Sequence, residues 1–507
     1  MMTVLSLLPI ITLLLCLIVV RVSVALAGGI SLATALVIAM GFFGLNLYGL
    51  SVAAGKALSL ALFVSLIVWS ALFLYHLAAD FRAVEVINKN IVLFIQDKFV
   101  VFLLLTWLFS GLLQGMAGFG VPIVIAAPIL IALGFDKVKS LAAVLLGHSW
   151  AVTFGSMGAS FFIIQMITGI PPQDLGFPMW IFNSSLHLMT GFGVCWLYDG
   201  IRGIKKGLGY IFPVSAVIGG VQYLTISGGF YPLATLIPAL AGLAAMFLLY
   251  KLRAKPKAPG GFYSGPLTLR QAVLPYAVVL GLSLLFQLLP PAAREISLSF
   301  SFPAFQTALE YPVQAETGYA RIRLFGHPVV KLLCAAVVAI VIYRRAGIWE
   351  PSVFRGAVKK TVKKGIPATL ALLALGTMSL VMMDSGMTHR LAYTVAALTG
   401  SAYPVFAPFF GVLASFLTGN NTNSNVLFGS FQYTIAQRLG VSGAVMSAAQ
   451  SLSGALGVSL SPTLVLMGAI ATKQDGQESL IYRKLIGIVL LIAFVMGLIN
   501  LLLVRVW

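Results

Sequence analysis

The sequence predicts an all-α polytopic membrane protein, and three observations lead to this class. Hydrophobic residues make up 60% of the 507 residues and charged residues only 9%, whereas a soluble domain carries about 25% charged residues. The mean hydropathy is +1.02. The apolar residues are gathered in runs of about 20, the length that a helix needs to cross a bilayer. A soluble chain of this length would form about three domains, but too few charges are present to cover their surfaces.

These runs predict about twelve transmembrane helices, of which two are long and interrupted. Two further apolar segments, 99–134 and 403–437, each carry a Gly-rich or Asn-rich interruption in the middle. We expect each to enter and leave the membrane on one side as a re-entrant hairpin. The expected crossings are 2–20, 22–45, 57–79, 138–169 (interrupted), 178–198, 208–225, 230–250, 269–290, 328–343, 366–384, 441–472 (interrupted) and 484–504.

Lysine and arginine set the expected orientation. There are 32 of them against 13 acidic residues, a formal net charge of +19. Basic clusters at 202–206, 251–257 and 344–364 are separated by two crossings each, so they share one side, which the positive-inside rule assigns to the cytoplasm. The loop 291–327 then lies outside. The amphipathic stretches 81–98 and 350–364 are expected along the cytoplasmic interface.

The same distribution bears on partners. Because the basic residues are scattered in short clusters between apolar runs, we expect a lipid bilayer around the chain and no nucleic-acid partner. The three cysteines all lie within apolar runs, which predicts no disulfide framework and no metal site. We expect no cofactor.

A shift of 306 residues aligns the features of the two ends of the chain. The crossing 22–45 falls on 328–351, 57–79 on 363–385 and 178–198 on 484–504, and the interruption at 153–156 falls on 459–462. The expected topology makes 57–79 run inward and 366–384 outward, so the repeats are inverted, which is typical of secondary transporters. We therefore divide the chain into repeat 1 (1–200), two connecting helices with a cytoplasmic loop (201–268) and repeat 2 (269–507).

The two hairpin tips and the two interrupted helices are the predicted substrate site. Glycines allow backbone amides to approach a ligand, and helix N-termini offer unpaired N–H groups and a partial positive charge, which suits a carboxylate. No arginine lies within the hairpins, which favours a small monoanion over a dicarboxylate. The expected substrate contacts are Ala117, Gly118, Phe119 and Gly120 in tip 1, Asn421, Thr422, Asn423, Ser424 and Asn425 in tip 2, and Ser156, Ser459 and Ser461 at the breaks.

Two ionisable residues are candidates for proton coupling. Ionisable side chains inside a membrane are costly and are functional hypotheses by default. His148 lies just before the first break, and a histidine ordinarily titrates at a pH of about 6.5. It is also a candidate for direct substrate binding, and the alternative is a packed histidine bonded to a carbonyl. Asp384 ends a long apolar run and is a proton or cation site, a helix cap or an interface residue.

At the tips the sequence resembles the L-lactate permease family. The residues that carry the resemblance are GMAGFGVP at 115–122, FGSMG at 154–158 and FLTGNNTNSNVLFG at 416–429. Two long motifs about 300 residues apart match in the same order, and the resemblance covers most of the chain. Two positions depart from the family pattern: Gln114 stands where a glutamate is frequent, and His148 where an asparagine is frequent.

The resemblance implies import of L-lactate, or of glycolate in related members, together with protons. It also implies a mobile domain of opposed hairpins that moves as an elevator against a dimeric scaffold. The sequence shows no Walker, HExxH or G-x-S-x-G motif, so we expect a transporter in a bacterial or archaeal cytoplasmic membrane and not an enzyme. The alternative is sodium coupling on the same fold, because the Asn/Ser/Thr-rich tip offers oxygen ligands for a cation.

Overall fold

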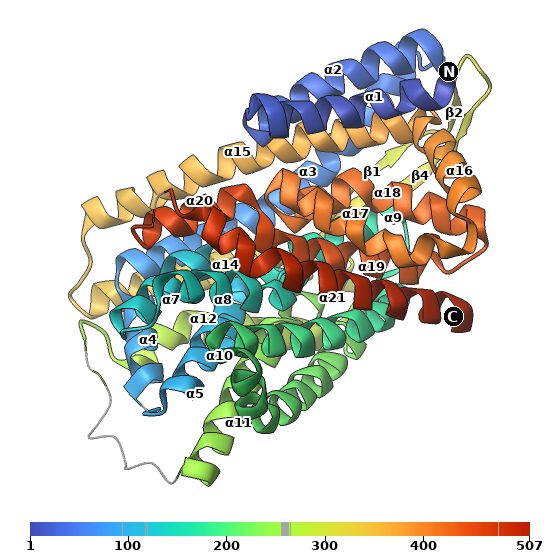
Figure 1. The fold of residues 1–507 in the computed structure, drawn as a ribbon. Coiled ribbons are helices and arrows are strands. Elements are labelled where there is room, and N and C mark those ends of the chain that lie inside the picture. Colours follow the sequence, from blue (N-terminus) through green and yellow to red (C-terminus); the bar gives the residue numbers. More distant parts are fainter. Residues whose placement is uncertain (94, 117, 119, 255–262, 264, 475) are drawn as a thin grey trace.

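The computed structural model describes residues 1–507 except 94, 117, 119, 255–262, 264 and 475. The chain is mainly helical (Figure 1). Its N-terminal helices are α1 (Met2–Leu15), α2 (Val24–Phe42), α3 (Leu47–Asp80), α4 (Ala83–Leu93), α5 (Lys98–Leu103), α6 (Ser110–Met116), α7 (Val121–Ala132), α8 (Lys137–Gly147), α9 (Gly155–Thr168), α10 (Pro172–Ser227) and α11 (Leu236–Ala254). The C-terminal helices are α12 (Leu269–Leu285), α13 (Pro291–Arg294), α14 (Pro328–Arg345), α15 (Pro351–Asp384), α16 (Met387–Thr399), α17 (Tyr403–Thr418), α18 (Asn421–Leu439), α19 (Gly443–Gly457), α20 (Pro462–Ala471) and α21 (Glu478–Val506).

The prediction of a helical polytopic membrane protein is confirmed. Among the described residues, nine helices are long and apolar enough to cross a membrane, or eleven if each bent pair is one span. Two expected crossings are helical but are not among these helices. The helix α12 is too short, with 17 residues, and α14 carries three cations. The expected crossings 178–198 and 208–225 are the two arms of α10, which folds back at Asp199 and Gly200.

The interrupted helices bend where the sequence predicts a break. The first pair, α8 with its short extension to Ala151 and α9, is bent by 56°, and the second pair, α19 extended to Leu460 and α20, by 41°. Pro462 opens α20, and a proline at the start of a helix leaves the preceding turn without an N–H to continue it. These bends place the ends of four helical segments in the interior.

Both predicted hairpins fold back on themselves. Phe102, near the start of the first, lies 5.3 Å from Phe135, just beyond its end, between ring centroids. In the second, the hydroxyl of Tyr403 donates to Gln432 at 2.9 Å. Each hairpin therefore brings its tip deep into the protein while its two ends stay together. The re-entrant character depends on where the membrane lies and stays a prediction.

One expectation about the scaffold needs correction, and the loop 291–327 contains strands that the sequence did not predict. The stretch 350–364 is not a separate interfacial segment, because α15 runs without a break from Pro351 to Asp384. No strand was predicted in the loop 291–327, but it contains two antiparallel pairs: β1 (Ser297–Phe302) with β4 (Glu316–Arg323), and β2 (Phe305–Gln306) with β3 (Pro312–Val313). Most side chains of β1 are exposed, so the loop lacks the alternation that predicts strands.

The arrangement in space follows from the longest helices. The helices α3 and α15 pack along each other, with α2 against α15 and α1 against α2 (Figure 1). The hairpin α17–α18 packs on α19, and α21 covers α17. The arms of α10 lie with α11 on the opposite side of the molecule from α1 and α2 (Figure 1). The interior between these layers holds the two tips.

Candidate functional site

The first tip rests on the first break. Gly118 has φ +61, and a Cβ added there would collide with the hydroxyl oxygen of Ser156. Gln114, which ends the first arm of the hairpin, is 6% exposed and lies against Gly118 and Gly155. The predicted residues Gly118 and Ser156 are thus brought together. Ala117 and Phe119 lie outside the described residues.

The break itself is a short left-handed segment. Ser156, Met157 and Gly158 have φ of 46°, 56° and 83°, and non-glycine residues adopt this region at a cost. The amide of Phe161 bonds to the carbonyl of Thr153 at 3.1 Å across the segment. The regular i to i−4 bonding is therefore interrupted beside tip 1, as the sequence predicts.

The second tip is held by bonds that cross to the N-terminal part of the chain. The side chain of Asn420 caps α18 by accepting from the amide of Asn423 at 2.8 Å. Asn421 donates to the hydroxyl of Thr153 at 3.2 Å, and Asn425 donates to the carbonyl of Ser160 at 3.0 Å. Tip 2 is therefore attached to both sides of the first break.

A second set of contacts joins tip 2 to α19. Asn425 also donates to the hydroxyl of Ser451 at 2.9 Å, and Gln450 donates to the hydroxyl of Ser424 at 3.2 Å. The amide of Gln432 in turn donates to Gln450 at 3.3 Å. Sequence reasoning missed Gln450 and Ser451. The signal was available, because buried polar side chains recurring in an apolar helix indicate a functional or packing interface.

The second break closes the site from the other end. Ser459 donates to the carbonyl of Leu456 at 2.6 Å, which caps its own helix end. Ser461 is fully buried, and its hydroxyl has no hydrogen-bond partner among the described residues. Gly419 of tip 2 faces it, since a Cβ built there would lie 3.6 Å from that hydroxyl. Ser461 is thus placed at the tip and Ser459 is occupied elsewhere.

The two tips therefore meet both broken helices. Gly120 of tip 1, with φ +78, packs so closely on Met467 of α20 that a Cβ has no room. The hydroxyl of Thr422 lies 3.0 Å from that of Ser160 in α9. Most of the predicted contacts that the structure describes in these four segments converge, and they are buried.

Buried oxygen acceptors are left over at this meeting point. Asn421 Oδ1, Asn425 Oδ1, Ser415 Oγ and Ser461 Oγ have no hydrogen-bond partner in the part of the chain that the structure describes. A buried polar group without a partner costs roughly 1–3 kcal/mol. Such acceptors are suited to the hydroxyl of a ligand or to a cation. Within the described ranges, no three His, Cys, Asp or Glu side chains gather where they could hold a metal ion.

Tip 2 also faces the long helices α3 and α15. A groove of about 20 Å³, enough for roughly one water molecule, lies between Asn423 and Thr422 on one side and Ser65 and Thr369 on the other. The hydroxyls of Ser65 and Thr369 lie 3.0 Å apart. On the side of the helix pair, these two hydroxyls lie among the apolar side chains of Val64, Val68, Ala368 and Leu372.

His148 is buried at the C-terminal end of α8. Its Nδ1 lies 2.8 Å from the carbonyl of Val144, so Nδ1 carries the proton and donates. Its Nε2 is buried and has no partner among the described residues. No hydrogen bond in that part of the chain joins His148 to either tip. The structure therefore shows an imidazole with one vacant acceptor, one helical turn before the first break.

Asp384 does not join the tips. It lies twelve residues beyond Leu372, which lines the groove beside tip 2, and twelve residues span about 18 Å of helix. Its carboxylate is 3.3 Å from the ammonium of Lys56 in α3, and that ammonium is 2.7 Å from Glu316 in β4. Lys56 and Asp384 are 1% and 3% exposed. The structure places Asp384 in a buried ion cluster that joins α15, α3 and β4.

Comparison with known proteins gives a consistent result. The model of the L-lactate permease family matches residues 2–260 and 292–507. The glycolate permease GlcA of Escherichia coli strain K12 is 28% identical over 98% of this chain and 94% of its own length. The L-lactate permease of the same strain is 28% identical over 86% of this chain and 84% of its own. A solved structure of Neisseria gonorrhoeae MtrF is similar at a TM-score of 0.47 and 14% identity over 87% of this chain and 81% of that chain.

The ion cluster generates a first prediction. Replacing Lys56→Met leaves the buried Asp384 without its cation, which should cost about 3 kcal/mol of stability and lower the thermal unfolding midpoint in detergent. The double variant Lys56→Met, Asp384→Leu should regain most of this stability, because the carboxylate that then lacks a cation, Glu316, is 35% exposed and remains in contact with water.

The matched control is Lys360→Met. Lys360 of α15 pairs with Asp80 of α3 at 2.6 Å, but the lysine is 56% exposed, and exposed pairs contribute about 0–1 kcal/mol. A midpoint lowered equally by both single substitutions would contradict the role assigned to burial.

Proposed function

This chain belongs to the L-lactate permease family, and we propose that it imports L-lactate or a similar small 2-hydroxy monocarboxylate, such as glycolate, by proton symport with alternating access. As a permease it is a multi-pass membrane transporter and not an enzyme. The observation that carries the proposal is the convergence of two polar helical tips on two broken helices in the interior. The names of the relatives, glycolate permease and L-lactate permease, set the substrate class.

The chemistry of the tips supports a small monoanion. The N-terminal ends of α18 and α20 lie together at tip 2, where a Cβ on Gly419 would be 3.6 Å from the hydroxyl of Ser461, and helix N-termini attract anions through unpaired N–H groups. No lysine or arginine lies in either tip. A single carboxylate is thus held by amides and dipoles, while the vacant acceptors of Asn421, Asn425 and Ser461 suit the 2-hydroxyl.

An inverted repeat supports alternating access. Shifted by 306 residues, α3 becomes 353–386 beside α15 (Pro351–Asp384), and α8 becomes 443–453 beside α19 (Gly443–Gly457). The same shift brings the first arm of α10 onto α21. Two opposed arrangements of one packing unit give two states of similar energy, open to opposite sides. We propose that the hairpins and broken helices move as an elevator against α3 and α15, in a homodimer in the cytoplasmic membrane.

Proton coupling is the part of the proposal that rests on His148. Its buried Nε2 is a vacant acceptor, and a histidine is the side chain that ordinarily titrates near neutral pH. Sodium coupling is the second candidate, because the unpartnered oxygens of Asn421, Asn425, Ser415 and Ser461 are the ligand type that hard cations prefer.

Uptake by proteoliposomes tests the function and the coupling together. Purified protein should accumulate labelled L-lactate and glycolate under an imposed pH gradient that is acidic outside, and a protonophore should abolish the accumulation. A dicarboxylate such as malate should not compete. Accumulation that follows a sodium gradient and ignores pH would move the proposal to sodium coupling, and no accumulation of any 2-hydroxy acid under either gradient would refute it.

Two glycines test the tips. Gly118→Ala should abolish uptake, because its Cβ would occupy the space of the Ser156 hydroxyl. Gly134→Ala is the matched control: its φ of +84 carries similar backbone strain, but a Cβ there meets nothing within 4 Å. The measurement is initial uptake rate at equal reconstituted protein, with the thermal midpoint recorded for both. Equal uptake rates in the two variants would show that tip 1 does not form the site.

His148→Ala tests the proton path. The rate of L-lactate uptake should lose its dependence on external pH, because the proton acceptor beside the first break is removed. His187→Ala is the control, since His187 is equally buried and both its ring nitrogens lack partners in the described structure. That variant should keep the parent's pH profile. A parent-like profile in His148→Ala would remove this residue from the coupling mechanism.

A further inference from the structure

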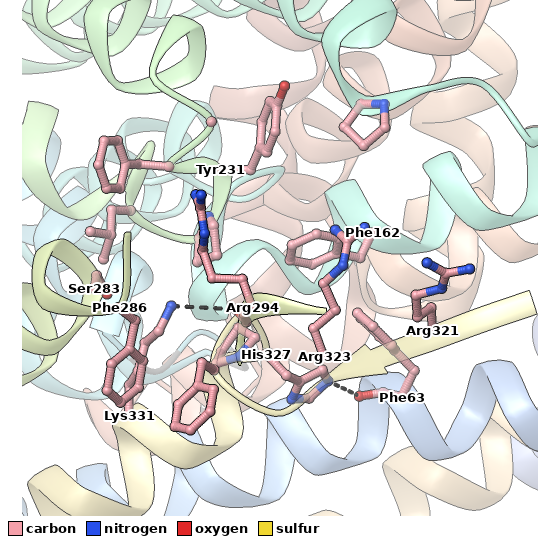
Figure 2. A pocket seen from close by; sticks show the side chains of 18 of the residues that line it. Phe63, Phe162, Tyr231, Ser283, Phe286, Arg294, Arg321, Arg323, His327 and Lys331 are labelled. Carbon is pink, nitrogen blue, oxygen red and sulfur yellow. Dashed lines mark hydrogen bonds between the residues drawn. The ribbon is translucent and has the colours of Figure 1, made fainter. Parts of the chain in front are cut away.

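A cavity of about 470 Å³ lies away from the tips, among α12, β4 and the start of α14. Four cationic side chains line it, Arg294, Arg321, Arg323 and Lys331, and Glu295 is the one carboxylate among its lining residues. The lining thus carries a formal charge of +3. Figure 2 shows Arg294, Arg323 and Lys331 extending into the same space from different elements. The end of α12 and the strand β4 lie on the side that the topology predicts to be external.

The described residues supply too little negative charge to neutralise the cations of this cavity. Arg321 and Arg323 share Glu295, each at 3.5 Å, and all three side chains are about half exposed. Lys331 is 6% exposed, and its ammonium donates to the carbonyl of Gly326 at 3.3 Å (Figure 2). No carboxylate in the described chain lies within ion-pair distance of Lys331. A buried ammonium without a counter-ion is costly, so the cavity favours an added anion.

Arg294 also lacks a carboxylate partner among the described residues. Its Nε is buried and has no hydrogen-bond partner among the described residues, and none of the ion pairs found in that part of the chain includes it. A guanidinium with free donors matches the two oxygens of a carboxylate. In His327, by contrast, both ring nitrogens have hydrogen-bond partners. Its Nε2 lies 3.1 Å from the carbonyl of Phe63, and its Nδ1 accepts from the amide of Val329. It is neutral in this arrangement.

The inner wall of the cavity adjoins the transport site. Phe162 of α9 contacts Phe63 of α3 edge to face, with centroids 5.4 Å apart. Two residues before Phe162, Ser160 bonds to Thr422 of tip 2. Tyr231 stacks on Phe161 at 4.6 Å and completes this wall. One layer of aromatic side chains therefore separates the cationic cavity from the uncharged tips.

We propose that this cavity is an external antechamber that binds a small carboxylate anion before the anion reaches the tips. The proposal rests on the proposed function for its choice of ligand, L-lactate. A cationic cleft raises the local concentration of an anion and its rate of capture, and the effect weakens as salt rises. The bound carboxylate supplies Arg294 and Lys331 with the negative charge that the chain does not.

Uptake kinetics give the first test. In proteoliposomes at low ionic strength, Arg294→Gln and Lys331→Gln should each raise the KM for L-lactate about 10-fold, the loss expected for one charged hydrogen bond, with Vmax close to the parent's. The difference in KM should shrink at high salt. Arg390→Gln, which removes an exposed cation of α16, is the matched control and should keep the parent's KM. Parent-like KM values in both cavity variants, with normal uptake, would overturn the antechamber and leave the transport function intact.

A second test does not depend on transport. Phenylglyoxal modifies accessible arginines, and peptide mass spectrometry follows its addition at Arg294 in liposomes of phosphatidylcholine alone or with phosphatidylglycerol. L-lactate should slow the modification in both lipids, and the neutral analogue lactamide should not. If Arg294 is protected from modification only when phosphatidylglycerol is present, the cavity binds a lipid headgroup. If Arg294 is not protected at all, the cavity binds no anion. Either result overturns the proposal. Protection by L-lactate without any uptake would support the cavity and refute the proposed function.

Discussion

Hydrogen bonds from the side-chain amides of tip 2 to the first broken helix hold the centre of this protein together. The amides of Asn421 and Asn425 donate to Thr153 and Ser160, more than 260 residues earlier in the chain. In surroundings that exclude water, a polar group without such a partner costs several kcal/mol. Tip 2 therefore cannot adopt its observed place unless the first broken helix is formed. The positions of Gly419, Gly118 and the breaks all depend on this pairing.

In the proposed mechanism, attraction of the anion and its binding for transport are separate tasks that one set of cations could have performed. Cationic side chains attract an anion from a distance, but they also hold the bound anion in place. Backbone amides and helix ends act only at contact. The cationic residues Arg294 and Lys331 lie on one side of the aromatic wall formed by Phe162, and the uncharged tips lie on the other. In the proposed path, an anion that leaves the cationic side enters a region where it is bound without strong, long-range attraction, which favours onward movement.

The sequence predicts the helices and breaks because their causes are local. Glycine, serine and proline interrupt apolar runs at 153–156 and 459–462, and both bends are present in the structure. The strands β1 and β4 were not predicted, because the side chains of β1 are mostly exposed and the pairing joins residues fourteen or more positions apart. The extension of α15 back to Pro351 was also missed, since its basic residues resemble an interfacial segment.

The candidate site was predictable in its parts but not in its connections. The glycines and asparagines of the tips are visible as polar runs in an apolar chain, and most of those described lie together. Their partners Gln450 and Ser451 lie in a different helix, and no spacing rule connects them to Asn425. Asp384 shows the same limit: its cation, Lys56, is 328 residues away, so the sequence shows an isolated carboxylate where the structure has an ion cluster.

The cluster of Lys56 with Asp384 and Glu316 has a consequence for how the chain is made. Lys56 is made with α3 early in synthesis, whereas both of its acidic partners emerge from the ribosome at least 260 residues later. Lys56 is 1% exposed in the folded protein, and an ammonium is costly to bury without a counter-ion. During that interval the Lys56 ammonium of α3 has no counter-ion, so the N-terminal helices do not reach their final packing until β4 and α15 have been synthesised. Final assembly of the scaffold is in this way tied to completion of the chain.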